Sequence, residues 1–171
     1  MNQDHFLQLL RLALQAIREP DLYETERAYQ GALLAEIRAR LDQDPIWPGS
    51  PLVEQEYEKN AAAQGVDVRP DVIIHYPFDR GVFEHHGQGN YAVLELRRRA
   101  GKQTALRDYA KLNTLCTVLD YAMGIFINVD ATEVFMPAYD GEANNRLHGF
   151  AVQLRGGLVY IQEGHPNVPR R

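Results

Sequence analysis

Hydrophobic positions in the N-terminal part of the chain recur at helical spacing and predict two helices. In the first segment, apolar side chains return every three or four residues as far as Pro20, which cannot continue a helix. Asp21 is a candidate N-cap for the next helix, and Glu24 three residues later completes a capping-box pattern. We therefore expect the second helix to run from near Leu22 to near Leu41. Its apolar stripe would comprise Leu22, Glu26, Tyr29, Leu33 and Ile37.

Three alternating segments in the middle of the chain predict neighbouring strands. They span residues 52–59, 69–76 and 91–98 and are separated by segments that contain proline, glycine or asparagine. Residues 103–121 return to helical spacing, and the β-branched run at 124–129 is typical of a buried strand. The expected order is two helices, three strands, a helix and a strand.

The last patterned segments predict a β-hairpin that completes one α/β domain. Residues 149–154 and 158–163 flank a pair of glycines, which tight hairpin turns favour. A chain of 171 residues with 45% hydrophobic content suffices for one full core and is short for two domains. We expect a single α/β (mixed α+β) domain over 1–171, made of an extra N-terminal helix (1–20), a core (22–129) and the C-terminal hairpin (149–162).

Three acidic side chains fall on positions that face the predicted core. Residues two apart on a strand share a face, so Glu95 and Arg97 point the same way, as do Asp71 and His75. Glu26 lies in the apolar stripe of the second helix. A buried carboxylate is costly unless it is paired, neutralised or bound to a cation. Three together suggest a divalent cation such as Mg²⁺, since the chain offers no Cys/His set for zinc.

The order and spacing of these acids resemble those of the PD-(D/E)XK nuclease-like superfamily, in particular its small stand-alone bacterial members. The resemblance covers residues from about 24 to 129. Asp71 in "VRPDVIIH" matches the motif aspartate, Glu95 in "VLELRR" the second acid, and Glu26 the glutamate of the first core helix, while "EQEYEKN" resembles an acidic-aromatic pair in the preceding strand. The resemblance implies a restriction-endonuclease-like core, in which a mixed four-stranded sheet lies between helices.

The same resemblance implies hydrolysis of phosphodiester bonds in DNA or RNA with Mg²⁺ (or Mn²⁺). Asp71 and Glu95 would then be metal ligands, and Glu26 a ligand through water or an orienting acid. The motif lysine is replaced by Arg97, which stays protonated and cannot act as a base. Arg97 could instead stabilise a metal-bound hydroxide or the scissile phosphate by its charge. His75, on the face of Asp71, is a candidate base.

Simpler interpretations remain open for these residues. Glu95 and Arg97 could form only an ion pair within one strand, and an inactive nuclease-like module that binds nucleic acid or a protein partner would keep the same pattern. Asp108 and Lys111 resemble the family's charged helix positions, but their i, i+3 spacing is more typical of a surface pair. The adjacent pair at 85–86, His85 and His86, is more typical of a hairpin tip than of a metal site.

Charge and composition narrow the choice of partners. The net charge is −5 and the pI is about 5.7, so nothing global attracts the chain to nucleic acid or to an anionic membrane. A local basic cluster could still contact phosphates beside the acids. Its members are Arg97, Arg98, Arg99, Lys102 and Arg107.

The single cysteine and the start of the sequence favour a cytoplasmic protein. Cys116 cannot form an internal disulfide and lies on an apolar helix stripe, which indicates packing rather than nucleophilic chemistry. We expect neither a signal peptide nor a membrane span, because no apolar run approaches the roughly 20 residues that cross a bilayer. The sequence allows a homodimer without establishing one.

Overall fold

The computed structural model describes residues 2–44, 52–55, 69–76, 89–142 and 144–164. Within these ranges, six strands form one mixed sheet in the order β1-β2-β3-β4-β5-β6, which confirms the expected α/β class. The strands are β1 (Leu52–Gln55), β2 (Val72–His75), β3 (Asn90–Arg98), β4 (Met123–Val129), β5 (Leu147–Arg155) and β6 (Leu158–Gly164). The expected tail of β1 at 56–59 and the histidines at 85–86 lie outside the described residues.

The sheet combines an antiparallel half with a parallel half. β1, β2 and β3 pair antiparallel, as neighbouring strands joined along the sequence often do. β3, β4 and β5 pair parallel, and β6 returns antiparallel to β5. Parallel neighbours need a long crossover, and between β3 and β4 the helix α3 (Lys102–Val118) provides it.

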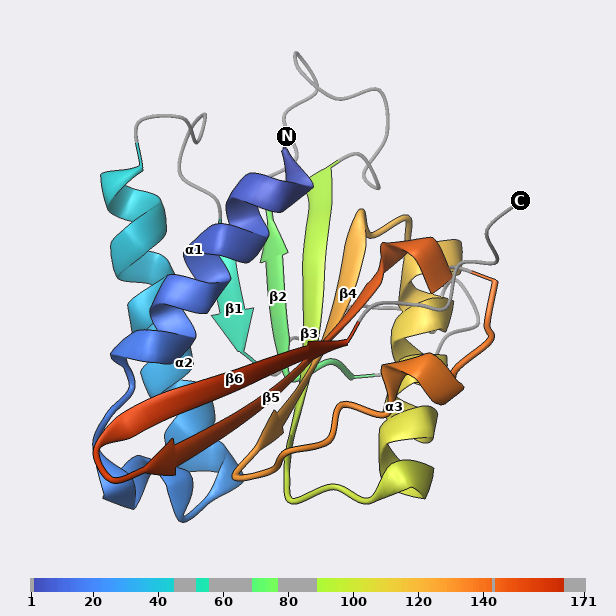
Figure 1. Ribbon diagram of the computed structural model, residues 1–171. Helices are drawn as coiled ribbons and strands as arrows, with labels where there is room; N and C mark the ends of the chain where they lie inside the picture. Colours follow the sequence, from blue (N-terminus) through green and yellow to red (C-terminus); the bar gives the residue numbers. More distant parts are fainter. Residues whose placement is uncertain (1, 45–51, 56–68, 77–88, 143, 165–171) are drawn as a thin grey trace.

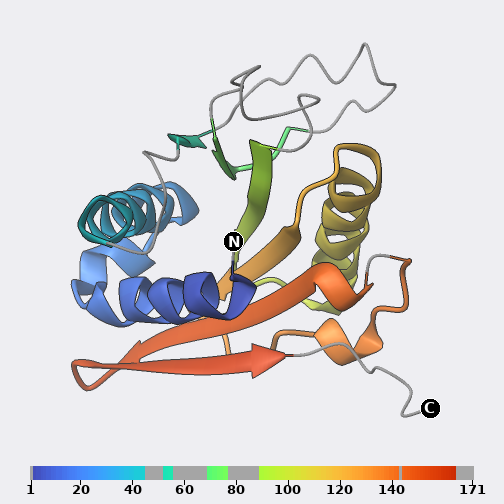
Figure 2. The same ribbon diagram turned by 90° about the horizontal axis from the view of Figure 1, so that it is seen from above.

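The three described α-helices cover the two faces of the sheet. α1 (Gln3–Ala16) and α2 (Glu26–Gln43) lie on one face and α3 lies on the other, as Figures 1 and 2 show. Alternate residues of β3 serve the two sides. Leu94 and Leu96 pack with α1 and α2, whereas Val93 packs with Ile73 and α3. Glu95 therefore lies on the α3 face.

The second helix begins later than its sequence pattern predicts. Pro20 starts a short 3₁₀ helix (Pro20–Tyr23) rather than the α-helix expected from Leu22. Thr25 is the N-cap of α2, and its Oγ1 accepts a hydrogen bond from the Ala28 amide at 3.1 Å. Glu26 is therefore the first residue of the helix, whereas the sequence pattern placed it in the middle of the apolar stripe.

The C-terminal hairpin has the predicted form. Gly156 and Gly157 connect β5 to β6 with φ of +56° and +77°, values that glycine adopts without steric cost. β6 packs beside α1, where the Arg11 Nη2 and the Glu163 Oε2 are 2.6 Å apart in a two-pronged ion pair. This pair joins the extra N-terminal helix to the extra hairpin.

No helix among the described residues is long and apolar enough to span a bilayer.

Asn128 fixes the end of β4 through three hydrogen bonds to the backbone. Its Oδ1 accepts from the Ala100 amide at 2.8 Å, and its Nδ2 donates to the Ala100 and Glu133 carbonyls at 3.1 and 2.9 Å. Because Asn128 is fully buried, truncation leaves backbone groups without partners. We expect Asn128→Ala to lower the free energy of unfolding by about 2 to 4 kcal/mol in denaturant titrations. The exposed Asn145→Ala is the matched control, and an equal effect of both variants would contradict this assignment.

Candidate functional site

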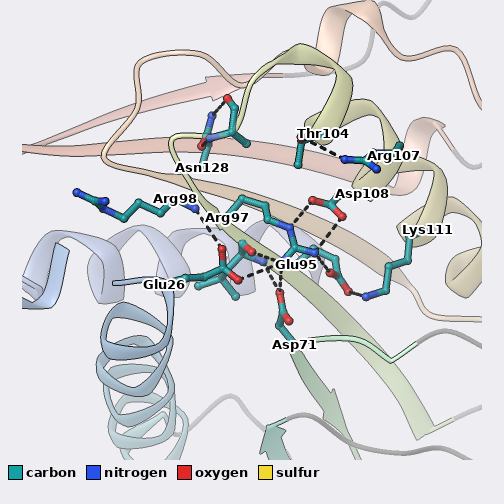
Figure 3. Close-up of polar contacts among 12 residues, drawn as sticks. Glu26, Asp71, Glu95, Arg97, Arg98, Thr104, Arg107, Asp108, Lys111 and Asn128 are labelled. Atoms are coloured by element: carbon teal, nitrogen blue, oxygen red, sulfur yellow. Dashed lines mark hydrogen bonds and ion pairs between the residues drawn. The ribbon is translucent and has the colours of Figure 1, made fainter. Parts of the chain in front are cut away.

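Charged side chains gather at one end of the sheet, where α2 begins, β3 ends and α3 starts (Figure 1). Figure 3 shows them converging from helices on both faces of the sheet and from two strands. The cluster, here called the acid-arginine cluster, consists of Glu26, Asp71, Glu95, Arg97, Asp108 and Lys111.

Arg97 lies at the centre of the acid-arginine cluster. Its Nη1 is 3.1 Å from Glu26 Oε1 and 3.5 Å from Asp71 Oδ2. Its Nη2 is 3.5 Å from Glu95 Oε2, and its Nε is 2.9 Å from Asp108 Oδ2. Burial would lower its pKa, but these carboxylates outweigh that effect and raise it above the usual value. The guanidinium is a permanent cation shared by four acids.

Asp71 lies beside Glu95 because of the register between β2 and β3. Val72 pairs with Leu94, so the residue before Val72 stands next to the residue after Leu94. The Asp71 Oδ2 accepts a hydrogen bond from the Leu96 amide at 2.8 Å, and Gln30 Nε2 donates to the Asp71 carbonyl at 2.8 Å. Both contacts fix Asp71 at the start of β2, beside β3.

Glu26 reaches the cluster from the other face of the sheet. It is the first residue of α2, and its side chain is 40% exposed. Besides Arg97, it accepts a hydrogen bond from the Arg98 amide at 3.3 Å. The predicted position in a packed stripe is wrong, and Glu26 shares with Asp71 and Glu95 a contact to Arg97.

Glu95 is the most buried acid of the cluster, with 0% exposure. Its Oε1 lies 2.6 Å from the Lys111 Nζ. Burial, reinforced by the charge of Asp71, outweighs Lys111 and Arg97 and raises the pKa of Glu95 to about 8. A carboxyl with a pKa of about 8 is largely protonated at neutral pH and ionises as the pH rises above it.

Asp108 and Lys111 are not the surface pair that their spacing suggests. Asp108 is buried against Arg97, and burial raises the pKa of its carboxyl despite that cation. Lys111 contacts Glu95 and also donates to the carbonyl of Arg69, just before Asp71. It thereby links the segments that carry the two motif acids. Two features of the sequence indicated that Asp108 and Lys111 belong to the site. Asp108 stands beside Tyr109 on the apolar stripe of α3, and both residues resemble charged positions of the family.

His75 lies away from the cluster. β2 carries it at the end opposite Asp71, where it pairs with Asn90 in the sheet. Its Nε2 is 2.7 Å from Glu54 Oε2 on β1. Sharing a strand face with Asp71 does not bring it near Glu95, because the strand separates the two residues along its length. The structure therefore does not support His75 as a base at this site.

Arg98, Arg99 and Lys102, the other predicted nucleic-acid contacts, differ in exposure to solvent and in their contacts within the protein. Arg98 donates from Nε to the Tyr23 carbonyl at 2.7 Å and lies 3.3 Å from Asp130. Arg99 shares Asp130 at 2.6 Å but is 63% exposed. Lys102 is exposed at the first residue of α3. Arg98 mainly contacts other parts of the protein, whereas Arg99 and Lys102 are exposed to solvent.

Cys116 is buried in α3, as expected for a packing residue. Burial raises the pKa of its thiol to about 12, an effect that Arg146 only partly offsets. Little thiolate therefore exists at neutral pH.

A divalent cation fits this cluster only with few protein ligands. The described residues contain no group of three or more His, Cys, Asp or Glu side chains arranged to hold a metal ion. Mg²⁺ commonly binds through one or two carboxylates and several waters. Lys111 contacts the Oε1 of Glu95, whereas the Oε2 lies 3.5 Å from Arg97 and accepts no hydrogen bond of good geometry from a described residue, and Asp71 is adjacent. With four acids against two cations, two negative charges stay uncompensated when all six groups are ionised.

Comparisons with protein-family models, with curated proteins and with solved structures find no match to this chain. The assignment of a function therefore depends on the geometry of the acid-arginine cluster and on the resemblance of its motif residues.

The raised pKa of Glu95 makes the stability of the metal-free protein depend on pH. The carboxyl has a pKa near 4.5 when unfolded and about 8 when folded, so the folded state holds the proton more tightly. This contribution is complete below pH 4.5 and is lost as the pH rises through 8. Between pH 5 and pH 8, we expect wild type to lose stability relative to Glu95→Gln by an amount on the order of 3 kcal/mol.

Denaturant unfolding of both proteins in a chelator measures this difference, in which the titration of the histidines cancels. The exposed Glu142→Gln should follow wild type at every pH. A difference between wild type and Glu95→Gln that stays constant from pH 5 to pH 8 would contradict the burial of a titrating carboxyl.

Proposed function

We propose that this protein is a Mg²⁺-dependent (or Mn²⁺-dependent) nuclease that hydrolyses phosphodiester bonds in DNA or RNA. The observation that carries the proposal is the pair of carboxylates formed by Glu95 on β3 and Asp71 directly before the neighbouring β2, with the cation Arg97 beside both. Acids that hold a metal next to a fixed positive charge form the arrangement that stabilises an attacked phosphate.

The order of elements supports the proposal. α2 is followed by the antiparallel strands β1 to β3, then by α3 and the parallel strand β4. We take this order of a helix, three strands, a helix and a strand as support for the proposed restriction-endonuclease-like core. α1 and the β5–β6 hairpin are additions at the two ends of that core.

The chain's own groups would divide the work as follows. Asp71 and Glu95 would hold the metal ion, which when bound supplies Lewis acidity and lowers the pKa of a bound water. Arg97 would hold the scissile phosphate through two N–H groups, and Glu26 and Asp108 orient its guanidinium. Lys111 is a positioning residue, because it fixes Glu95 and the chain before Asp71.

Solvent-facing cations beside the cluster suit a nucleic-acid backbone. Arg99 directly follows β3 and Lys102 is the first residue of α3. The exposed Arg107 lies on the same helix and is labelled in Figure 3. Such side chains bind phosphates irrespective of base sequence. They give a net-acidic protein a local surface for a polyanion.

A second candidate function is supported by the contacts of Arg97. A guanidinium that already contacts all four carboxylates holds them together without a metal ion. The protein would then be a catalytically inactive nuclease-like module that binds nucleic acid or a protein partner.

Cleavage assays on the metal acids test the proposal directly. We expect wild type to cut single- or double-stranded DNA or RNA with Mg²⁺ or Mn²⁺ and to stop in a chelator. Asp71→Asn and Glu95→Gln should each lower the cleavage rate by about 100-fold or more. The asparagine keeps an oxygen that can accept the hydrogen bond from the Leu96 amide. The exposed Glu142→Gln should cut like wild type. Activity that survives in the chelator or in both acid variants would point to a contaminating enzyme and against this site.

Substitution of Arg97 distinguishes the two candidate functions. Lysine restores a compact, titratable ammonium near the water, so Arg97→Lys should cut at least as fast as wild type. Arg97→Ala removes the charge that stabilises the phosphate and should cut about 100-fold more slowly. If wild type and Arg97→Lys are both inert on a panel of DNA and RNA, the inactive module is the better description.

A further inference from the structure

We propose that Arg97 exchanges between the carboxylates of the cluster and a nucleic-acid phosphate, so that a polyanion and a divalent cation bind cooperatively. The proposal rests on the proposed function, because it concerns the same metal acids. It adds a coupling between two ligands, which the nuclease assignment by itself does not require.

The first argument is that Arg97 and a metal ion compete for the same oxygens. The guanidinium lies 3.5 Å from an oxygen of Asp71 and 3.5 Å from an oxygen of Glu95, the two acids that would hold the ion. Two neighbouring cations repel strongly where water is scarce, and Glu95 is fully buried. In the arrangement of Figure 3, Arg97 therefore weakens the binding of a divalent cation.

The second argument is that Arg97 is free to change partners. Its side chain is 28% exposed, and its partners Glu26 and Asp71 are 40% and 21% exposed, so this part of the cluster is open to solvent. Lys111 differs, because it is tied to Glu95 and to a backbone carbonyl. Of the two cations that contact Glu95, Arg97 is the one that a ligand can draw outward without losing a backbone contact to another segment.

The third argument is that a phosphate is a suitable competitor for the guanidinium. Arginine binds phosphate through two parallel N–H groups, in the geometry that it also uses for carboxylates. When Arg97 turns to a phosphate, the four acids keep only Lys111 as a cation, and a divalent ion more than replaces the lost positive charge. Because linkage is reciprocal, the metal strengthens binding of the nucleic acid by the same factor.

The test measures Mn²⁺ affinity by electron paramagnetic resonance, with and without a cleavage-resistant phosphorothioate oligonucleotide. For wild type, we expect the oligonucleotide to tighten Mn²⁺ binding by about fivefold or more, after subtraction of Mn²⁺ bound by the oligonucleotide alone. Arg97→Ala should bind Mn²⁺ about tenfold tighter than wild type without oligonucleotide, and the oligonucleotide should change its affinity little. Arg97→Gln keeps much of the side-chain volume and should behave in the same way if the alanine variant folds poorly.

Arg155→Ala is the matched control, because it removes an equal charge from an exposed position on the hairpin and should leave both affinities unchanged. Mn²⁺ affinity that is equal in wild type and in both Arg97 variants would overturn the proposal, as would a wild-type affinity that the oligonucleotide does not alter. In either case, metal-dependent cleavage would still stand. Absence of Mn²⁺ binding to every variant, with or without oligonucleotide, would instead refute the metal site and the proposed function with it.

Discussion

The guanidinium of Arg97 is the interaction on which the arrangement of this end of the molecule depends. It contacts carboxylates from four separate segments: the start of α2, the residue before β2, β3 itself and the second turn of α3. Without a central cation these acids would repel one another, and Glu95 would be a fully buried charge with Lys111 alone to compensate it. The Arg97 side chain therefore connects α2, α3, β3 and the start of β2 through ion pairs.

The same requirement for a cation connects the fold with both candidate functions. The cluster has two more acids than cations, so it can take an additional positive charge, yet its present cation suffices to keep the acids together. Replacement of the usual lysine by arginine has two consequences. Arginine cannot give up its proton to serve as a base, but it binds phosphate as readily as carboxylate. A site built around arginine thus favours binding and charge stabilisation over proton transfer.

Most of the fold could be predicted from hydrophobic periodicity, because burial of one face fixes the pattern of each helix and strand. β3, α3, β4 and the glycine hairpin appear close to their predicted bounds, whereas β2 is shorter than predicted and β1 is described only as far as Gln55. The start of α2 was wrong because Asp21 and Glu24 imitate a capping box, whereas Thr25 is the residue whose side chain caps the helix. Local motifs of this kind cannot show which of two nearby caps is used.

The sequence by itself determined that Glu95 and Arg97 lie on one face of a strand and that Asp71 stands at the start of the neighbouring one, since the strand period is two. Only the tertiary structure decided what meets those faces. Register placed Asp71 beside Glu95 and left His75 at the far end of β2. Packing of α3 turned Asp108 and Lys111 from an apparent surface pair into partners of Arg97 and Glu95. The reason is physical: periodicity fixes the direction of a side chain on its own element, whereas its partners depend on how distant elements pack.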